Sequence, residues 1–151
     1  MLDLASPKWQ RLRVPLGDAR RIPDLIRAFQ RAPGIDAFDN FFQELTGCGD
    51  LAIYDSFYAA LPYAVEMIPL LNGSDFEQAL AQLGWAIALS DESADPACRD
   101  ESFNAAKHEV AILAHTLLHS GDPVEHRAYI VAALAAGRGR YDRALRIIDR
   151  I

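Results

Sequence analysis

Residues 74–87 read Ser-Asp-Phe-Glu-Gln-Ala-Leu-Ala-Gln-Leu-Gly-Trp-Ala-Ile, and this stretch decides the class of fold. Its large apolar residues recur at spacings of four, three and four, which places them on one face of a helix. They are Phe76, Leu80, Leu83 and Ile87. The opening Ser-x-x-Glu is a capping-box pattern, in which Ser74 and Glu77 would satisfy free amides at the helix start. The stretch predicts an amphipathic helix over about residues 75–90.

The same periodicity continues on both sides of this stretch. Residues 101–119 give the longest example, with an apolar stripe at Phe103, Ala106, Val110, Leu113 and Leu117. Further helices are expected over 19–31 after a cap at Asp18, from Asp36 to Gly47, from Asp50 to Leu61 with a kink or new start at Pro62, over 123–136 and over 140–150. The one candidate strand, Leu12–Leu16, contains a proline, which disfavours it inside a sheet. The sequence predicts an all-α chain of seven or eight helices, bundled or stacked as antiparallel hairpins.

The length and composition suit a small globular protein. The chain has 151 residues, of which 51% are hydrophobic and 24% charged, so we expect one helical domain over 1–151. No apolar run reaches the roughly 18–20 residues of a membrane span. The N-terminus lacks the basic and then apolar order of a signal peptide. Cys48 and Cys98 form no disulfide framework, which fits a reducing compartment. We therefore expect a cytoplasmic protein that does not bind membranes.

Charge is strongly segregated along the chain, whose net charge is −6. Residues 1–31 carry seven Lys and Arg against three Asp and Glu, a net charge of +4. Residues 32–126 carry two basic and sixteen acidic residues, a net charge of −14, and residues 127–151 return to +4. The acidic middle argues against nucleic acid as a ligand, because binding phosphates needs a basic surface. It would attract a basic protein, or it would only keep the chain in solution.

A more specific signal lies in residues 53–68, Ile-Tyr-Asp-Ser-Phe-Tyr-Ala-Ala-Leu-Pro-Tyr-Ala-Val-Glu-Met-Ile, followed by a Leu-Gly-Trp-Ala-Ile segment at 83–87. This pattern resembles bacterial HEAT-like repeat proteins, in which a Tyr-x-x-Ser-Tyr-Ala-Ala-Leu-Pro helix bends at its proline. The matching positions are Trp9, Leu12, Ser56, Tyr58, Pro62 and Gly84. The resemblance covers residues 9–90, and the C-terminal third is equally similar to a tetratricopeptide repeat.

The resemblance implies antiparallel helical hairpins stacked as a short HEAT-like α-solenoid, and it implies no chemistry. Such proteins are mostly interaction scaffolds. Small ones encoded beside bacterial toxins look like immunity proteins. We therefore expect a non-catalytic, cofactor-free protein that neutralises a basic toxin by occluding its active site.

The residues expected to bind this partner are acidic side chains, with two tyrosines as anchors. Five acids fall between residues 91 and 101, more than helix capping requires, and they would form either a docking patch or a solvated linker. The aromatic residues between 38 and 63 are expected in the core, although some of them would instead line a groove. The candidates are Asp50, Tyr54, Asp55, Tyr58, Asp91, Glu92, Asp95 and Glu101.

An alternative function, a helical metal-binding protein or metal-dependent enzyme, rests on the histidines His108, His115, His119 and His126. The first three fall on one side of the predicted helix 101–119, where imidazoles could bind zinc or another transition metal. However, the His-Thr-Leu-Leu-His pattern lacks the glutamate of a zinc peptidase motif. His108 lies about 10 Å along the helix from His115, too far for all three to share one ion. A polar helix face or a partner contact explains the same pattern.

Motifs for other chemistry are missing. No serine lies in a Gly-x-Ser-x-Gly nucleophile motif. The Gly-x-Gly pairs at 47–49 and 137–139 lack the Lys-Ser or Lys-Thr of a phosphate-binding loop, so they indicate helix ends. We therefore do not expect an enzyme.

Overall fold

The computed structural model describes residues 1–47, 53–93 and 100–151, with no side chain of α4 described beyond Ser90. The α-helices in this part are α1 (Ile22–Arg31), α2 (Ile35–Thr46), α3 (Asp55–Met67), α4 (Gly73–Ser93), α5 (Glu101–His119), α6 (Arg127–Gly137) and α7 (Tyr141–Ile148). Short 3-10 helices are η1 (Pro7–Arg11), η2 (Ala19–Arg21) and η3 (Ile68–Leu70), and a small antiparallel hairpin pairs β1 (Arg13–Val14) with β2 (Gly17–Asp18). The predicted all-α class is thereby confirmed in its broad form.

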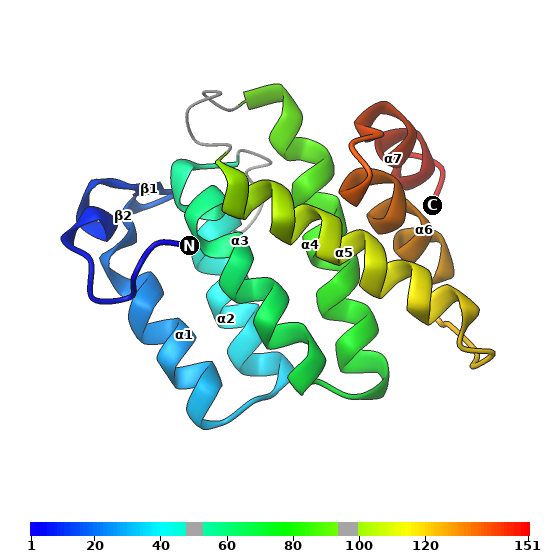
Figure 1. Ribbon diagram of the computed structural model, residues 1–151, viewed down its shortest axis with the longest axis horizontal. Helices are drawn as coiled ribbons and strands as arrows, with labels where there is room; N and C mark the ends of the chain where they lie inside the picture. Colours follow the sequence, from blue (N-terminus) through cyan, green and yellow to red (C-terminus); the bar gives the residue numbers. More distant parts are fainter. Residues whose placement is uncertain (48–52, 94–99) are drawn as a thin grey trace.

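Helices α1 to α6 alternate between two layers (Figure 1). In one layer α3 contacts both α1 and α5, and in the other α4 contacts both α2 and α6. Across the layers α1 packs on α2, and α5 packs on α6. Helix α7 covers the C-terminal end, where it contacts α4 and α6. The layer of α2, α4 and α6 carries the candidate site described below.

The buried side chains form one continuous core from Trp9 to Ala144. The stripe predicted for α4 lies in it, since Leu80, Leu83 and Ile87 are fully buried. On α5, Phe103 and Val110 are also fully buried, whereas Leu113 and Leu117 are only partly covered. Burial of these stripes supplies the main stabilising free energy of such a fold.

Small residues let α6 approach its neighbours closely. Its buried positions are Ile130, Ala132, Ala133, Ala135, Ala136 and Gly137. A Cβ atom on Gly84 of α4 would lie 2.2 Å from the Cβ atom of Ala133 and 2.4 Å from its Cα atom. No side chain fits in that space, so the crossing of α4 and α6 requires glycine at position 84.

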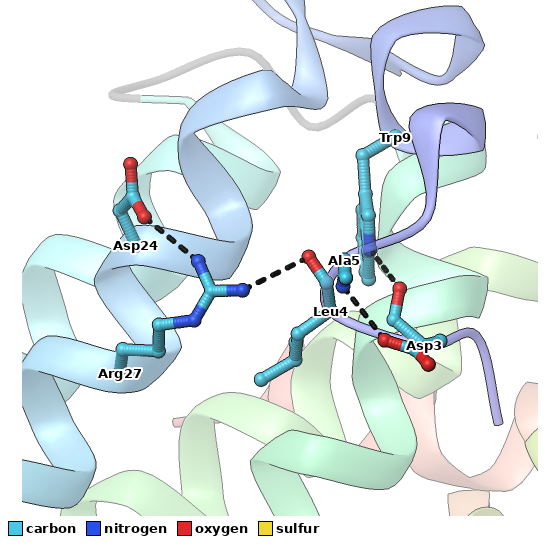
Figure 2. A network of polar contacts seen from close by, with 6 residues as sticks. All are labelled: Asp3, Leu4, Ala5, Trp9, Asp24 and Arg27. Carbon is cyan, nitrogen blue, oxygen red and sulfur yellow. Dashed lines mark hydrogen bonds and ion pairs between the residues drawn. The ribbon is translucent and has the colours of Figure 1, made fainter.

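The N-terminal residues fold back onto α1. Figure 2 shows the indole of Trp9 beside Asp3, whose backbone carbonyl accepts a hydrogen bond of 2.9 Å from Nε1. Arg27 of α1 donates to the carbonyl of Leu4 at 3.2 Å and pairs with Asp24 at 2.9 Å. Trp9 is only 1% exposed, and the half-buried Leu2 and Leu4 pack against the core, so these contacts hold the N-terminal segment on the core.

The predicted capping box at the start of α4 is wrong. The helix begins at Gly73, one residue ahead of the expected cap Ser74. The carboxylate of Glu77 accepts a hydrogen bond of 3.2 Å from the backbone N–H of His126. Glu77 is 8% exposed, so this buried carboxylate serves the turn before α6 rather than its own helix start.

Two further helix starts differ from expectation. Helix α3 begins at Asp55 and continues through Pro62 without a break, whereas a start at Asp50 was expected, and Asp50 lies outside the described residues. Helix α6 begins at Arg127 rather than near residue 123. It follows directly after His126, whose backbone N–H donates to Glu77. Helix α5 has its predicted bounds.

Candidate functional site

An open groove of about 390 Å³ lies on the layer of α2, α4 and α6. Helix α4 contributes most of its lining, α2 contributes one aromatic ring, and the start of α6 contributes two more rings. The lining residues are Phe42, Gln78, Ala81, Gln82, Trp85, His126 and Tyr129. We call this site the α4 groove. Its lining contains no carboxylate, lysine or arginine, so its surface is aromatic and amide in character.

The register of α4 explains why these side chains meet. Gln78, Gln82 and Trp85 follow one another at spacings of four and three and are all half-buried. By contrast, Leu80, Leu83 and Ile87 of the core stripe are fully buried. At the start of α6, the rings of His126 and Tyr129 lie 6.5 Å apart in an edge-to-face arrangement. The groove therefore presents aromatic surface that the fold itself does not cover.

A carboxylate stands next to this groove. Asp39 of α2 is half-buried, and its oxygens accept hydrogen bonds from Gln82 Nε2 at 2.9 Å and from Gln78 Nε2 at 3.2 Å. Both donors are neutral amides that also line the groove. Among the described residues no arginine, lysine or histidine forms an ion pair with Asp39. Two glutamines thus hold a carboxylate in a fixed orientation without neutralising its charge.

Other acidic side chains already have arginine partners. Arg13 of the hairpin pairs with Asp55 of α3 at 3.1 Å, and Arg21 pairs with Glu44 of α2 at 3.2 Å. In both pairs the arginine side chain is 70% exposed, so each contributes little stability. The basic N-terminal segment therefore lies against part of the acidic middle and offsets its charge. The segregation of charge along the sequence is therefore only partly retained in the folded chain.

These pairings change the set of expected partner-binding residues. Tyr58 is 3% exposed, and its hydroxyl donates to the carbonyl of Ser90 at 2.7 Å, so it offers no anchor to a partner. Asp55 is engaged by Arg13. Tyr54 is half-buried just before α3, and Glu101 is exposed in the first turn of α5. Tyr58 belongs to the core, as expected for the aromatic cluster as a whole.

Four of the expected partner-binding residues lie beyond the described side chains. Asp50 and Asp95 lie outside the described residues. Asp91 and Glu92 belong to α4, but their side chains are not described. Next to this segment, Asp100 caps α5, because its carboxylate accepts hydrogen bonds from the Phe103 N–H at 2.9 Å and the Ser102 hydroxyl at 2.7 Å. These bonds hold the pKa of Asp100 below its ordinary value.

The histidines are divided between two places. The rings of His115 and His119 stack at 4.2 Å on the exposed side of α5, and His119 Nδ1 bonds the backbone carbonyl of His115 at 2.8 Å. His108 is exposed on the same helix, whereas His126 lines the α4 groove. Within the residues described, no three His, Cys, Asp or Glu side chains gather as a metal site would require. Metal binding by His115 and His119 stays a prediction, which elemental analysis of chelator-free protein would test.

A larger hollow of about 900 Å³ lies between the hairpin and helices α1 and α2. Its charged lining includes Asp18, Arg20, Arg21 and Glu44, and these residues pair with one another. We therefore consider the α4 groove the better candidate site.

This groove was not predicted from the sequence, although one signal for it is present there. Gln78, Gln82 and Trp85 form a second stripe on α4, and a tryptophan outside the core stripe indicates surface available for contact. Asp39 is not among the residues expected to bind the partner. Its importance depends on the two amides that α4 supplies, which no single-helix pattern indicates.

Comparison with known proteins adds no further assignment. No family model matches the chain, and no significant match exists among curated proteins or solved structures. Among the helices in the described residues, none combines the length and the apolar character needed to cross a bilayer.

Proposed function

We propose that this chain is a non-catalytic protein-binding module that uses the α4 groove and nearby acidic side chains to bind a basic partner. The observation that carries the proposal is the Asp39 carboxylate, which stands next to exposed aromatic surface and forms no ion pair within the described part of the chain. A cation brought to such a half-buried carboxylate interacts with it more strongly than it would in bulk water.

The helix arrangement supports a short α-solenoid as the framework. Helices α1, α3 and α5 follow one another in one layer, and α2, α4 and α6 follow one another in the other. Stacked helical hairpins with this order present extended surfaces for partners. We therefore place the partner on the layer of α2, α4 and α6, where the groove lies.

We propose further that the partner is a bacterial toxin domain and that the chain acts as its immunity protein in the cytoplasm. A toxin that cleaves or modifies nucleic acid needs a basic surface to hold phosphates. An acidic module that covers this surface blocks the substrate without chemistry of its own. Charge complementarity of this kind also accelerates the encounter of the two proteins.

The experiment uses a basic protein whose gene lies beside the gene for this chain. Alternatively, it uses a basic protein from the native host that binds to the immobilised chain. Its affinity for the chain and its enzymatic activity are measured over a range of salt concentrations. We expect inhibition, together with a Kd that rises with salt. Double reversal of Asp36→Lys and Asp39→Lys should weaken binding at least about tenfold.

A matched control reverses two acids of the C-terminal region, Asp142→Lys and Asp149→Lys, which changes the net charge by the same amount. Both residues are exposed. The control should leave the Kd within about twofold of the wild-type value, since neither residue lines the groove. If the α2 variant and the control bind alike, the surface proposed here is not the binding surface.

A further inference from the structure

We propose that the α4 groove receives one arginine side chain of the partner, whose guanidinium pairs with Asp39 while its plane lies against Trp85 and Tyr129. This inference rests on the proposed function, because it names the group that the same surface recognises. Three features of the groove favour arginine: the arrangement of the carboxylate, the aromatic walls and the charges nearby.

The carboxylate is arranged for a donor from outside. An ionised carboxylate offers about four lone-pair sites. Gln78 and Gln82 provide one donor nitrogen each, at distances of 3.2 Å and 2.9 Å from the carboxylate of Asp39. Acceptor capacity therefore remains on a residue that is itself only half-buried. Two parallel N–H donors of a guanidinium suit this capacity better than the single point charge of an ammonium.

The aromatic walls favour the same ligand. Trp85 and Tyr129 are both half-buried, and they line the groove with Phe42. A cation placed over such rings is attracted by their negative faces, and tryptophan is the strongest partner. The planar guanidinium also stacks on aromatic rings, and it gives up its hydration more readily than an ammonium.

The charges around the groove also favour a cation. Glu77 is buried beside the groove, where it accepts the N–H of the lining residue His126. No lysine or arginine is among the lining residues, and the following Arg127 is exposed. The fold thus supplies two carboxylates next to the groove and leaves the positive charge to the partner.

The test is an NMR titration of the whole ¹⁵N-labelled chain with the blocked tripeptide acetyl-Gly-Arg-Gly-amide at low salt. The chain contains two tryptophans, which makes the indole N–H signals an internal comparison. Trp85 lines the groove, whereas Trp9 is 1% exposed and bonded to Asp3. We expect the Trp85 indole signal to shift in a saturable way while the Trp9 signal stays in place. The matched lysine and glutamate tripeptides should give much weaker shifts.

The carboxylate is tested with Asp39→Asn, which keeps the shape of the side chain. This variant should raise the Kd of the arginine tripeptide at least about fivefold. The control Asp142→Asn removes the same charge from an exposed position on α7 that does not line the groove, and it should change the Kd less than about twofold. Circular dichroism checks that each variant is folded. If Asp39→Asn does not fold, Tyr129→Leu takes its place, with the same loss of affinity expected.

Several outcomes overturn the inference. These are the absence of a Trp85 shift, equal shifts of Trp85 and Trp9, equal binding of the lysine or glutamate peptide, and an unchanged Kd in Asp39→Asn or its substitute. The arginine assignment and the proposed function can fail independently of each other. If a basic partner binds the Asp39→Asn chain as tightly as the wild type, the arginine assignment is wrong while protein binding stands.

Discussion

The carboxylate of Asp39 and the amide of Gln82 are joined by a hydrogen bond of 2.9 Å, which links α2 to α4 beside the groove. Gln78 makes a second, longer link to the same carboxylate. The pair therefore has two consequences. It fixes the orientation of an acidic group, and it contributes to the packing of two neighbouring helices in one layer.

The second consequence predicts a modest stability effect. Asp39→Ala removes the acceptor for two half-buried amides, so we expect it to lower the free energy of unfolding by about 1 kcal/mol or slightly more. Asp36→Ala removes an exposed acid from the same helix and should change stability by less than about 0.5 kcal/mol. Urea denaturation followed by circular dichroism gives both values. Equal effects of the two substitutions would show that the hydrogen bonds from the two glutamine amides contribute nothing measurable to stability.

The crossing of α4 and α6 predicts a larger effect at Gly84. Gly84→Ala would place a Cβ atom 2.4 Å from the backbone Cα atom of Ala133, so the two helices must move apart. We expect a loss of about 2 kcal/mol or more, because the cost of overpacking exceeds the gain of about 1 kcal/mol in helix propensity. Gly34→Ala is the matched control, since no atom lies within 4 Å of its added Cβ. Thermal unfolding that ranks the two variants in the opposite order would contradict this account of the crossing.

The ion pair between Arg13 of the hairpin and Asp55 of α3 predicts a small interaction energy. In a double-mutant cycle with Arg13→Gln and Asp55→Asn, the interaction energy should be about 0.2–1 kcal/mol and should fall as salt is added. The reason is solvent exposure, which is 70% for the Arg13 side chain and 30% for Asp55. A coupling well above this range that persists in high salt would mean that the pair is shielded from water.

The cap of α5 predicts a pH dependence. Hydrogen bonds from Phe103 and Ser102 lower the pKa of Asp100 in the folded chain, so its contribution to stability is present above the ordinary pKa and is lost as the pH falls below about 4. Asp100→Ala should cost about 0.5–2 kcal/mol near neutral pH. The difference between variant and wild type should shrink in acid. Chemical denaturation at pH 7 and at about pH 3 measures it, and a constant difference would exclude Asp100 as the titrating cap.

Many of the helices could be predicted from short-range patterns of apolar and capping residues in the sequence. The α5 stripe from Phe103 to Leu117 repeats often enough to fix the helix and its buried side. Asp18 was expected to cap a helix, and its carboxylate accepts the Arg20 N–H at 3.1 Å at the start of η2, which leads into α1. These features depend on residues only a few positions apart, so local physical chemistry determines them.

The features that were not predicted from the sequence depend on residues far apart in the chain. Glu77 was expected to bond the start of its own helix, yet it bonds His126, which lies 49 positions away. Asp55 stays a predicted partner-binding residue, but its ion pair with Arg13 of the hairpin, 42 positions away, was not predicted. The groove itself requires α2, α4 and α6 together. Periodicity within one helix cannot indicate which distant side chain will meet a given acid.

The central claim, that the α4 groove is the contact surface for a basic protein, is tested most directly by the accessibility of Trp85. In a Trp9→Phe variant that is shown to be folded, Trp85 is the sole tryptophan, and acrylamide quenching reports its exposure. Adding the basic partner at saturating concentration should markedly reduce the quenching constant of Trp85. A partner that binds with full affinity and leaves Trp85 as accessible as before would contradict the account.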